Sequence, residues 1–218
     1  MPTMPIHDQV DALLAAADAG PLPIVAAGDP VLRRPAEPVD GQLSDTALAR
    51  LVEVMRRTMH EAPGVGLAAP QIGVALRLAV LEDAATVTEE VATARGRVPQ
   101  PFRVLVNPSY EAVDGGRRVA FYEGCLSVPG YQAVVARHER VRLRALDERG
   151  RAVDEEIGGW PARIVQHETD HLNGTLYLDR AELRSLASTQ TRAAVERWAQ
   201  PTPVLAAAEL GFALPESG

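Results

Sequence analysis

The sequence predicts an α+β fold in which short antiparallel sheets surround one central helix, with a further helix towards each end of the chain. Three observations support this prediction. An apolar stripe with helical spacing runs through residues 44–61, and short apolar runs bounded by turn residues lie between residues 76 and 145. A helical segment with two histidines one turn apart then follows near residue 170. A length of 218 residues is compatible with one domain.

The N-terminal third contains two predicted helices. The first is the alanine-rich segment 11–19. The second covers residues 44–61, where Ser44 is a suitable N-cap and the Pro63-Gly64 pair ends the helix. Its apolar residues recur on one face and are Leu48, Leu51, Val52, Met55 and Met59.

The middle of the chain predicts strands. Residues 76–81 and 103–107 are short apolar runs, and Pro108 is expected to end the second. The polar segment 82–101 between them is expected to be a mobile insertion. Further along, apolar residues alternate with arginines, which predicts a half-buried strand with a solvated basic face. The apolar residues of this strand are Val141, Leu143 and Ala145.

The last part of the chain predicts two helices. Pro161 suits the first position of a helix that runs to about Leu172, and Gly174 lies beyond its end. A final helix is predicted for residues 180–199, and a tail that contains proline and alanine follows it.

The composition excludes several classes of function. Cys125 is the single cysteine, so the chain cannot contain an internal disulfide, and we expect a reducing, cytoplasmic environment. The 22 basic residues are all arginine, which excludes lysine Schiff-base chemistry and Walker-type phosphate loops. A net charge of -7 argues against a general nucleic-acid-binding surface. We see no secretory signal and no apolar run long enough to span a membrane.

Residues 167–171, His-Glu-Thr-Asp-His, are the segment that indicates chemistry. Positions i and i+4 share one face of a helix, so His167 and His171 can bind one metal ion while Glu168 reaches a water molecule beside it. The neighbouring Asp170 is expected to orient a ligand or to hold the helix in place. The alternative is a solvated helix face that has two histidines by chance.

A catalytic metal needs a third protein ligand, and Cys125 is the strongest candidate. No histidine follows His171, and no later glutamate lies in a recognisable metal-binding motif. A lone cysteine is ordinarily a small buried core residue, which is the alternative here. Because the sequence offers no other evident third ligand beside the two histidines, we favour a metal-binding role for Cys125. A thiolate with two imidazoles suits both zinc and iron.

Three segments together resemble the peptide deformylase family. They are residues 64–73, Gly-Val-Gly-Leu-Ala-Ala-Pro-Gln-Ile-Gly; residues 123–127, Glu-Gly-Cys-Leu-Ser; and residues 166–174, Gln-His-Glu-Thr-Asp-His-Leu-Asn-Gly. The resemblance covers about residues 22–195. We therefore expect an N-terminal extension (1–20), a deformylase-like catalytic domain (21–200) and a C-terminal tail (201–218). Taken alone, the glycine segment could be a turn after a helix, or more weakly a nucleotide-binding loop.

The resemblance implies a metal centre and a proton carrier. Cys125, His167 and His171 are the implied metal ligands, with water in the fourth position. Glu168 is the implied general base for attack on the formyl carbon, and then the general acid for the leaving amine. Fe²⁺ is the implied metal in the cell, while Zn²⁺, Ni²⁺ or Co²⁺ could occupy the purified protein.

The resemblance also implies an oxyanion hole, a peptide-binding edge and a supporting pair. The side chain of Gln71 and the backbone N–H of Leu126 are the implied oxyanion donors. The residues implied along the bound peptide are Val65, Gly66 and Gly124. The supporting pair is Glu123 with Arg137. Arg163 and Ile164 are expected to border the pocket for the methionine side chain.

The implied function is hydrolytic removal of the formyl group from the N-terminal formyl-methionine of new polypeptides, with release of formate. The implied partners are N-formyl-methionyl nascent peptides. The resemblance also allows a transient contact with the ribosome. We expect a monomer that binds neither nucleic acid stably nor membranes. Two alternatives remain open: a metallopeptidase that uses the same helix on internal amide bonds, and a catalytically silent relative that binds peptides or the ribosome.

Overall fold

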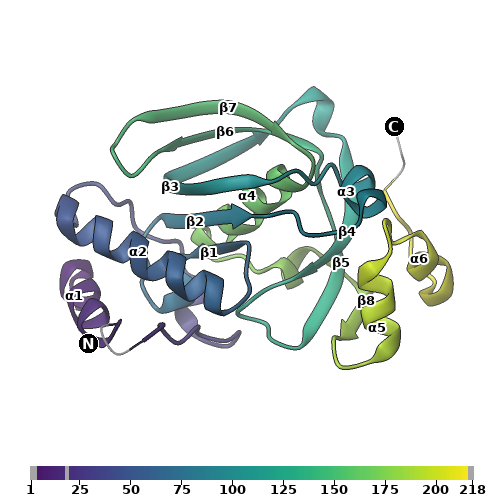
Figure 1. The fold of residues 1–218 in the computed structure, drawn as a ribbon, viewed down its shortest axis with the longest axis horizontal. Helices are drawn as coiled ribbons and strands as arrows, with labels where there is room; N and C mark the ends of the chain where they lie inside the picture. The colour runs from purple at the N-terminus through teal and green to yellow at the C-terminus, as the bar shows by residue number, and fades with distance from the viewer. Residues whose placement is uncertain (1–3, 18–19, 216–218) are drawn as a thin grey trace.

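Two antiparallel sheets and six α-helices make up the described part of the chain, residues 4–17 and 20–215, in the computed structural model (Figure 1). The helices are α1 (Ile6–Ala17), α2 (Asp45–Glu61), α3 (Glu89–Arg95), α4 (Gly159–Leu172), α5 (Arg192–Ala199) and α6 (Val204–Leu210). The strands are β1 (Gly66–Ala68), β2 (Leu78–Asp83), β3 (Gln100–Ala112), β4 (Arg118–Gly124), β5 (Tyr131–His138), β6 (Arg140–Leu146), β7 (Ala152–Gly158) and β8 (Ala181–Ser188). The predicted α+β class is confirmed.

The strands form one sheet of order β1-β2-β3-β6-β7 and a second of order β4-β5-β8. Every pair of neighbours is antiparallel. β1 and β4 are therefore edge strands, as are β7 and β8, and within the described residues each has one side free of strand pairing. In β6, Val141 and Leu143 are buried while the arginines between them are exposed, as the alternation predicts.

The central helix is α4, which contacts strands of both sheets. Every residue from Trp160 to Leu172 is buried except the half-buried His167. The helix begins at Gly159, so Pro161 is its third residue rather than its first. Gly174 lies beyond the end with a φ of 74°, a conformation that favours glycine. Burial of the histidine-bearing helix excludes the alternative of a solvated face.

The predicted helix over residues 44–61 is present as α2. Ser44 is its N-cap, and its side chain accepts a hydrogen bond from the Ala47 N–H. The apolar face packs into the largest core cluster together with α1. The first helix begins at Ile6, five residues before the predicted start and in front of its alanine-rich part.

The segment 82–101 contains a packed helix, and its interpretation as a mobile insertion is wrong. The Thr88 side chain caps α3 by accepting from the Val91 N–H. Arg95, at the end of α3, is 4% exposed and lies over the Trp160 ring. The polar composition is misleading here because a buried arginine packs through its stem and its guanidinium plane.

The strand predicted for residues 103–107 is longer than expected. β3 continues through Pro108 to Ala112, because its pairing with β6 shifts register between Val106 and Ser109. Asn107 has a φ of 51° at this irregularity. Proline cannot donate to a sheet ladder, and a bulge is one of the few places where a strand accepts it.

The single helix predicted for residues 180–199 is wrong. Residues 181–188 form β8, which pairs with β5, and α5 begins only after Thr191. The Ser185 hydroxyl accepts from the Val134 N–H on β5, so the strand is joined to its neighbour through a side chain as well. Tertiary pairing outweighs local helix propensity in this segment.

The tail beyond residue 200 is structured in part. α6 packs on the second sheet, where Ala206 shares a buried cluster with Tyr122 and Val134. Within residues 4–17 and 20–215, no helix is both long and apolar enough to cross a membrane.

Candidate active site

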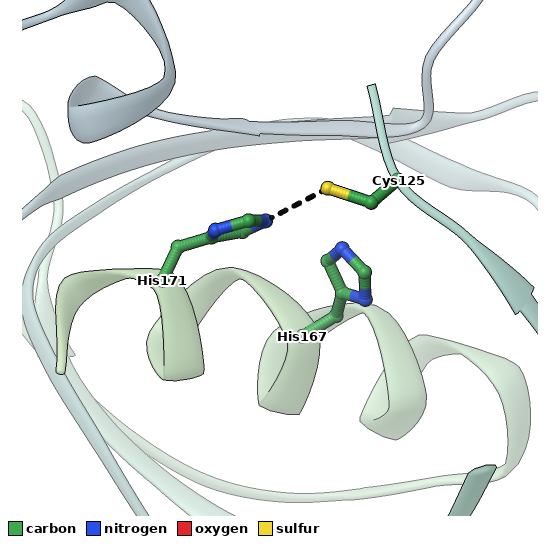
Figure 2. A group of neighbouring side chains, drawn as sticks. All are labelled: Cys125, His167 and His171. Carbon is green, nitrogen blue, oxygen red and sulfur yellow. Dashed lines mark hydrogen bonds between the residues drawn. The ribbon is translucent and has the colours of Figure 1, made fainter. Parts of the chain in front are cut away.

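The structure brings Cys125, His167 and His171 together at the surface of α4 (Figure 2). Both histidines rise from the helix one turn apart, and the cysteine points towards them from the segment after β4. The Cys125 Sγ lies 3.3 Å from the His171 Nε2, and one ligand atom of each residue lies within 4.8 Å of the others. In a tetrahedral site with ordinary zinc bond lengths, a sulfur and a nitrogen ligand are about 3.6 Å apart. The three side chains therefore fit one metal ion.

Glu123 orients the first histidine. Its Oε2 lies 3.0 Å from His167 Nδ1, which leaves the other ring nitrogen free to face the cysteine. Arg137 donates two hydrogen bonds to the same carboxylate, at 2.6 and 2.9 Å. Burial alone would raise the pKa of Glu123, but the Arg137 charge, the His167 hydrogen bond and the Arg163 charge together hold it well below its ordinary value. Glu123 is thus a buried carboxylate ion.

Arg163 belongs to this cluster as well. It is 3% exposed and donates to Glu123 Oε1 at 2.5 Å. It also donates to the backbone carbonyls of Val119 and Val135. Burial lowers its pKa to about 10, which still leaves the guanidinium charged near neutral pH.

Asp170 fixes the helix to three separate segments. Its carboxylate accepts from Arg137 at 2.8 Å, from Arg180 at 2.8 Å and from the Tyr110 hydroxyl at 3.0 Å. The expectation that this residue holds the helix in place agrees with these contacts. Arg137 therefore bridges two buried carboxylates, Glu123 on β4 and Asp170 on α4.

Glu168 lies beside the three candidate ligand residues and is 4% exposed. Within the described residues, its Oε2 has no hydrogen-bond partner. Burial raises its pKa to about 7, a value suited to accepting and returning a proton near neutral pH. Gly66 forms the opposite wall, and a methyl group there would overlap the Glu168 carboxylate. The glycine is required by this close approach.

Gln71 directs its amide group towards the same centre. Its Oε1 accepts from the Ala68 N–H at 2.8 Å, which fixes the amide orientation. Its Nε2 consequently faces Cys125 Sγ at 3.6 Å and Ser127 Oγ at 3.3 Å. Leu126 follows Cys125 directly, so its backbone N–H lies next to a candidate ligand residue.

The edge strands β1 and β4 flank this centre. Gly66 begins β1 directly after Val65, and Gly124 ends β4. The chain just before β1 approaches the chain just after β4, because a Cβ on Gly64 would lie 2.7 Å from a methyl carbon of Leu126. An extended peptide placed between the edges could pair with main-chain groups on both sides.

Some residues of the site have no signal in the sequence. Tyr110 and Arg180 reach Asp170 from β3 and from the turn before β8. Tyr177 stacks on the His167 ring, with centroids 6.2 Å apart. Their spacing along the chain follows no motif, so only the three-dimensional structure reveals them.

Comparison with known proteins identifies the family. The family model described as "Polypeptide deformylase" matches residues 21–186, more than half of the chain. This chain belongs to the polypeptide deformylase family. The family is one of metal-dependent hydrolases, in agreement with a cysteine and two histidines placed around one point. This result supports the deformylase interpretation and not the metallopeptidase alternative.

Relatives within the deformylase family match nearly the whole chain. The chain is 73% identical to "Peptide deformylase 3" of Streptomyces avermitilis over 97% of its own length and 92% of the relative. It is 70% identical to "Peptide deformylase 1" of Streptomyces coelicolor over 97% and 95%. A solved Acinetobacter baumannii class I type b peptide deformylase with Met-Ala-Ser bound is 35% identical, with a TM-score of 0.65 over 73% of this chain and 98% of that one.

Proposed function

We propose that this protein hydrolyses the formyl group from the N-terminal formyl-methionine of newly made polypeptides and releases formate and a free amine. The observation that supports this most directly is the convergence of Glu168, Gln71 and the Cys125–His167–His171 set on one point between two edge strands. Membership of the deformylase family supports the same reaction.

The proposed proton carrier is Glu168. When bound by Cys125, His167 and His171, a divalent metal lowers the pKa of water towards about 7 and polarises the carbonyl group. Glu168 takes the proton of the attacking water and delivers it to the leaving nitrogen, so that the C–N bond breaks to give formate and an amine. Its buried position keeps the carboxylate from being screened by solvent.

The proposed oxyanion hole consists of Gln71 and Leu126. As the formyl carbon becomes tetrahedral, negative charge develops on its oxygen. The Gln71 amide and the Leu126 backbone N–H donate to that oxygen, and the hydrogen bond from Ala68 keeps the Gln71 amide in position. The peptide itself lies between Val65, Gly66 and Gly124, which pair with its main chain.

We propose Fe²⁺ as the metal in the cell, with Zn²⁺, Ni²⁺ or Co²⁺ as substitutes in purified protein. A thiolate with two imidazoles is a donor set that suits both iron and zinc. Because an Fe(II)–thiolate site is sensitive to oxygen, we place the protein in the reducing cytoplasm. We propose that it acts there on nascent chains as a monomer, and that any contact with the ribosome is transient. Metal analysis of protein purified without air tests the metal assignment.

The test of the proposed function is formate release from formyl-Met-Ala-Ser under anaerobic conditions, with iron or nickel loaded. We expect one formate for each new amine. Absence of release from metal-loaded protein would contradict the proposed function. Cleavage of internal amide bonds without formate would instead indicate a peptidase.

The Gln71→Ala variant tests the oxyanion role. We expect kcat to fall by about 10²–10³, because one preorganised donor to the developing charge is lost. Metal content should hold, since Gln71 is not a proposed ligand. The measurements are steady-state kinetics and metal content on the same preparation. An increase in KM at unchanged kcat would mean that Gln71 only binds the substrate.

A further inference from the structure

A one-residue bulge in β3 turns Tyr110 towards α4. Before the bulge, Leu105 packs in the core cluster that contains residues of α4, whereas Val104 and Val106 pack in the cluster that contains residues of α2. Side chains alternate along a strand, so Tyr110 would ordinarily share the α2 side with Val104 and Val106. Between Val106 and Ser109, however, three steps along β3 lie opposite only two steps along β6. The extra residue reverses the alternation, and Tyr110 therefore projects to the α4 side.

The neighbours of Tyr110 support this direction. Tyr110 lies opposite Leu143 on β6, and Leu143 is buried in the cluster that contains residues of α4. The Tyr110 hydroxyl donates to Asp170 Oδ1 at 3.0 Å. Burial and the Asp170 charge raise the pKa of Tyr110 to about 12, so the hydroxyl keeps its proton and donates at neutral pH. This hydrogen bond joins the five-stranded sheet to α4.

The bulge is itself held in place by hydrogen bonds. The side chain of Asn107 accepts from the Val39 N–H at 2.9 Å and donates to Asp40 Oδ1 at 2.9 Å. Arg77 donates to the Pro108 carbonyl at 2.7 Å, and also to the last carbonyl group of α4 at 3.3 Å. The bulge is therefore fixed both to the loop before α2 and to the end of α4, and the position of Tyr110 is fixed with it.

A continuous row of buried contacts leads from Tyr110 to the candidate metal site. Asp170 accepts from Arg137 at 2.8 Å, and the same guanidinium donates to both oxygens of Glu123. Glu123 Oε2 in turn lies 3.0 Å from His167 Nδ1. Asp170, Arg137 and Glu123 are each at most 4% exposed. Because a guanidinium is planar and rigid, the position of one carboxylate restricts the position of the other.

Tyr110 is the neutral donor at the outer end of this row. Asp170 also pairs with Arg180, but the Arg180 side chain is 40% exposed, so solvent screens that pair. We propose that Tyr110 is a positioning residue for the metal site: acting through the row of buried contacts, its hydroxyl sets the orientation of His167 and strengthens metal binding. This inference rests on the metal site of the proposed function, and it does not depend on the identity of the substrate.

The test is the metal dissociation constant of Tyr110→Phe, measured without air by competition between metal-free protein and a chelator for Zn²⁺ and for Co²⁺. Groups that touch a metal ligand typically change the affinity 10–100-fold, and Tyr110 lies several contacts further out. We therefore expect binding to weaken by about three- to tenfold. The visible spectrum of the Co²⁺-loaded protein, which reports ligand geometry, should change as well.

Tyr122→Phe is the matched control, because it removes the same hydroxyl from another tyrosine. Tyr122 on β4 is 2% exposed, and among the residues that the structure describes its hydroxyl has no hydrogen-bond partner. Its dissociation constants and Co²⁺ spectrum should equal those of the unchanged protein. Equal dissociation constants in Tyr110→Phe and Tyr122→Phe would overturn the inference, even if Tyr110→Phe lowered the Tm of the metal-free protein.

A double-mutant cycle with Asp170→Asn tests the route. If Tyr110 acts through the Asp170 carboxylate, the effects of the two changes on metal binding should not add. Full additivity would overturn the proposed route. If Asp170→Asn does not fold, the comparison of Tyr110→Phe with Tyr122→Phe decides the outcome alone.

These measurements need no substrate, so they separate this inference from the proposed function. Absence of formate release from metal-loaded protein would contradict the proposed function and leave the inference standing. An unchanged protein that binds neither metal would overturn both.

Discussion

Replacing Glu168 with glutamine is expected to lower kcat by about 10²–10⁴, the usual contribution of a positioned general acid–base. Glutamine has nearly the same shape and fits between α4 and Gly66, but it cannot accept and return a proton. Metal content should be retained, because the three proposed ligands are unchanged. Formate release and metal content from one anaerobic preparation provide the measurement.

The matched control for this change is Glu53→Gln, which removes the same charge from an exposed position on α2. We expect its kcat to equal that of the unchanged protein. Full activity in Glu168→Gln would exclude Glu168 as the proton carrier. A protein that is inactive even with Glu168 intact and metal loaded would instead support the alternative of a catalytically silent relative.

Replacing Arg137 with methionine is expected to give the largest loss of stability. Arg137 is 2% exposed and neutralises both Glu123 and Asp170, so its removal leaves two carboxylates buried with fewer partners. Breaking a buried pair in this way costs about 3–5 kcal/mol in the free energy of unfolding. For a protein of this size, that lowers Tm by roughly 6–20 °C. Thermal unfolding of metal-free protein measures the effect.

Arg142→Met is the control for Arg137→Met. Arg142 forms an equally short ion pair with Asp154, but both side chains are nearly half exposed, at 44% and 46%. An exposed pair is screened by solvent and contributes little to stability, so Tm should change little. Equal losses in the two variants would contradict the structural role of the buried cluster.

We also expect Arg137→Met to weaken metal binding by about 10–100-fold, because Glu123 no longer holds His167 firmly.

The sequence predicts best those parts of the fold that local chemistry determines. Ser44 and the apolar stripe behind it specify α2, and the alternation around Val141 specifies β6. The two histidine ligand candidates are predictable for the same reason, because any helix places residues i and i+4 side by side on one face. The third candidate, Cys125, is predictable only because the alternatives for a third ligand are few.

The sequence predicts least where distant segments decide the structure. Residues 181–188 have no strong strand pattern, and they form a strand because their backbone pairs with β5. Nothing in the sequence indicates that the charged Arg95 is buried. Its guanidinium donates to backbone carbonyls that lie more than 100 residues further along the chain. The position of Arg163 just before the histidines does not reveal its pairing with Glu123, which lies 40 residues away.

The free edges of β1 and β4 have a consequence for when the enzyme can act. A substrate that is bound as an additional strand is recognised mainly through its backbone, so it must arrive extended and without secondary structure of its own. An N-terminus that has already joined a helix or a sheet has no free amide groups to offer. With the proposed binding mode, removal of the formyl group therefore competes with folding of the new chain. The enzyme can bind each N-terminus only while its first residues are still unfolded.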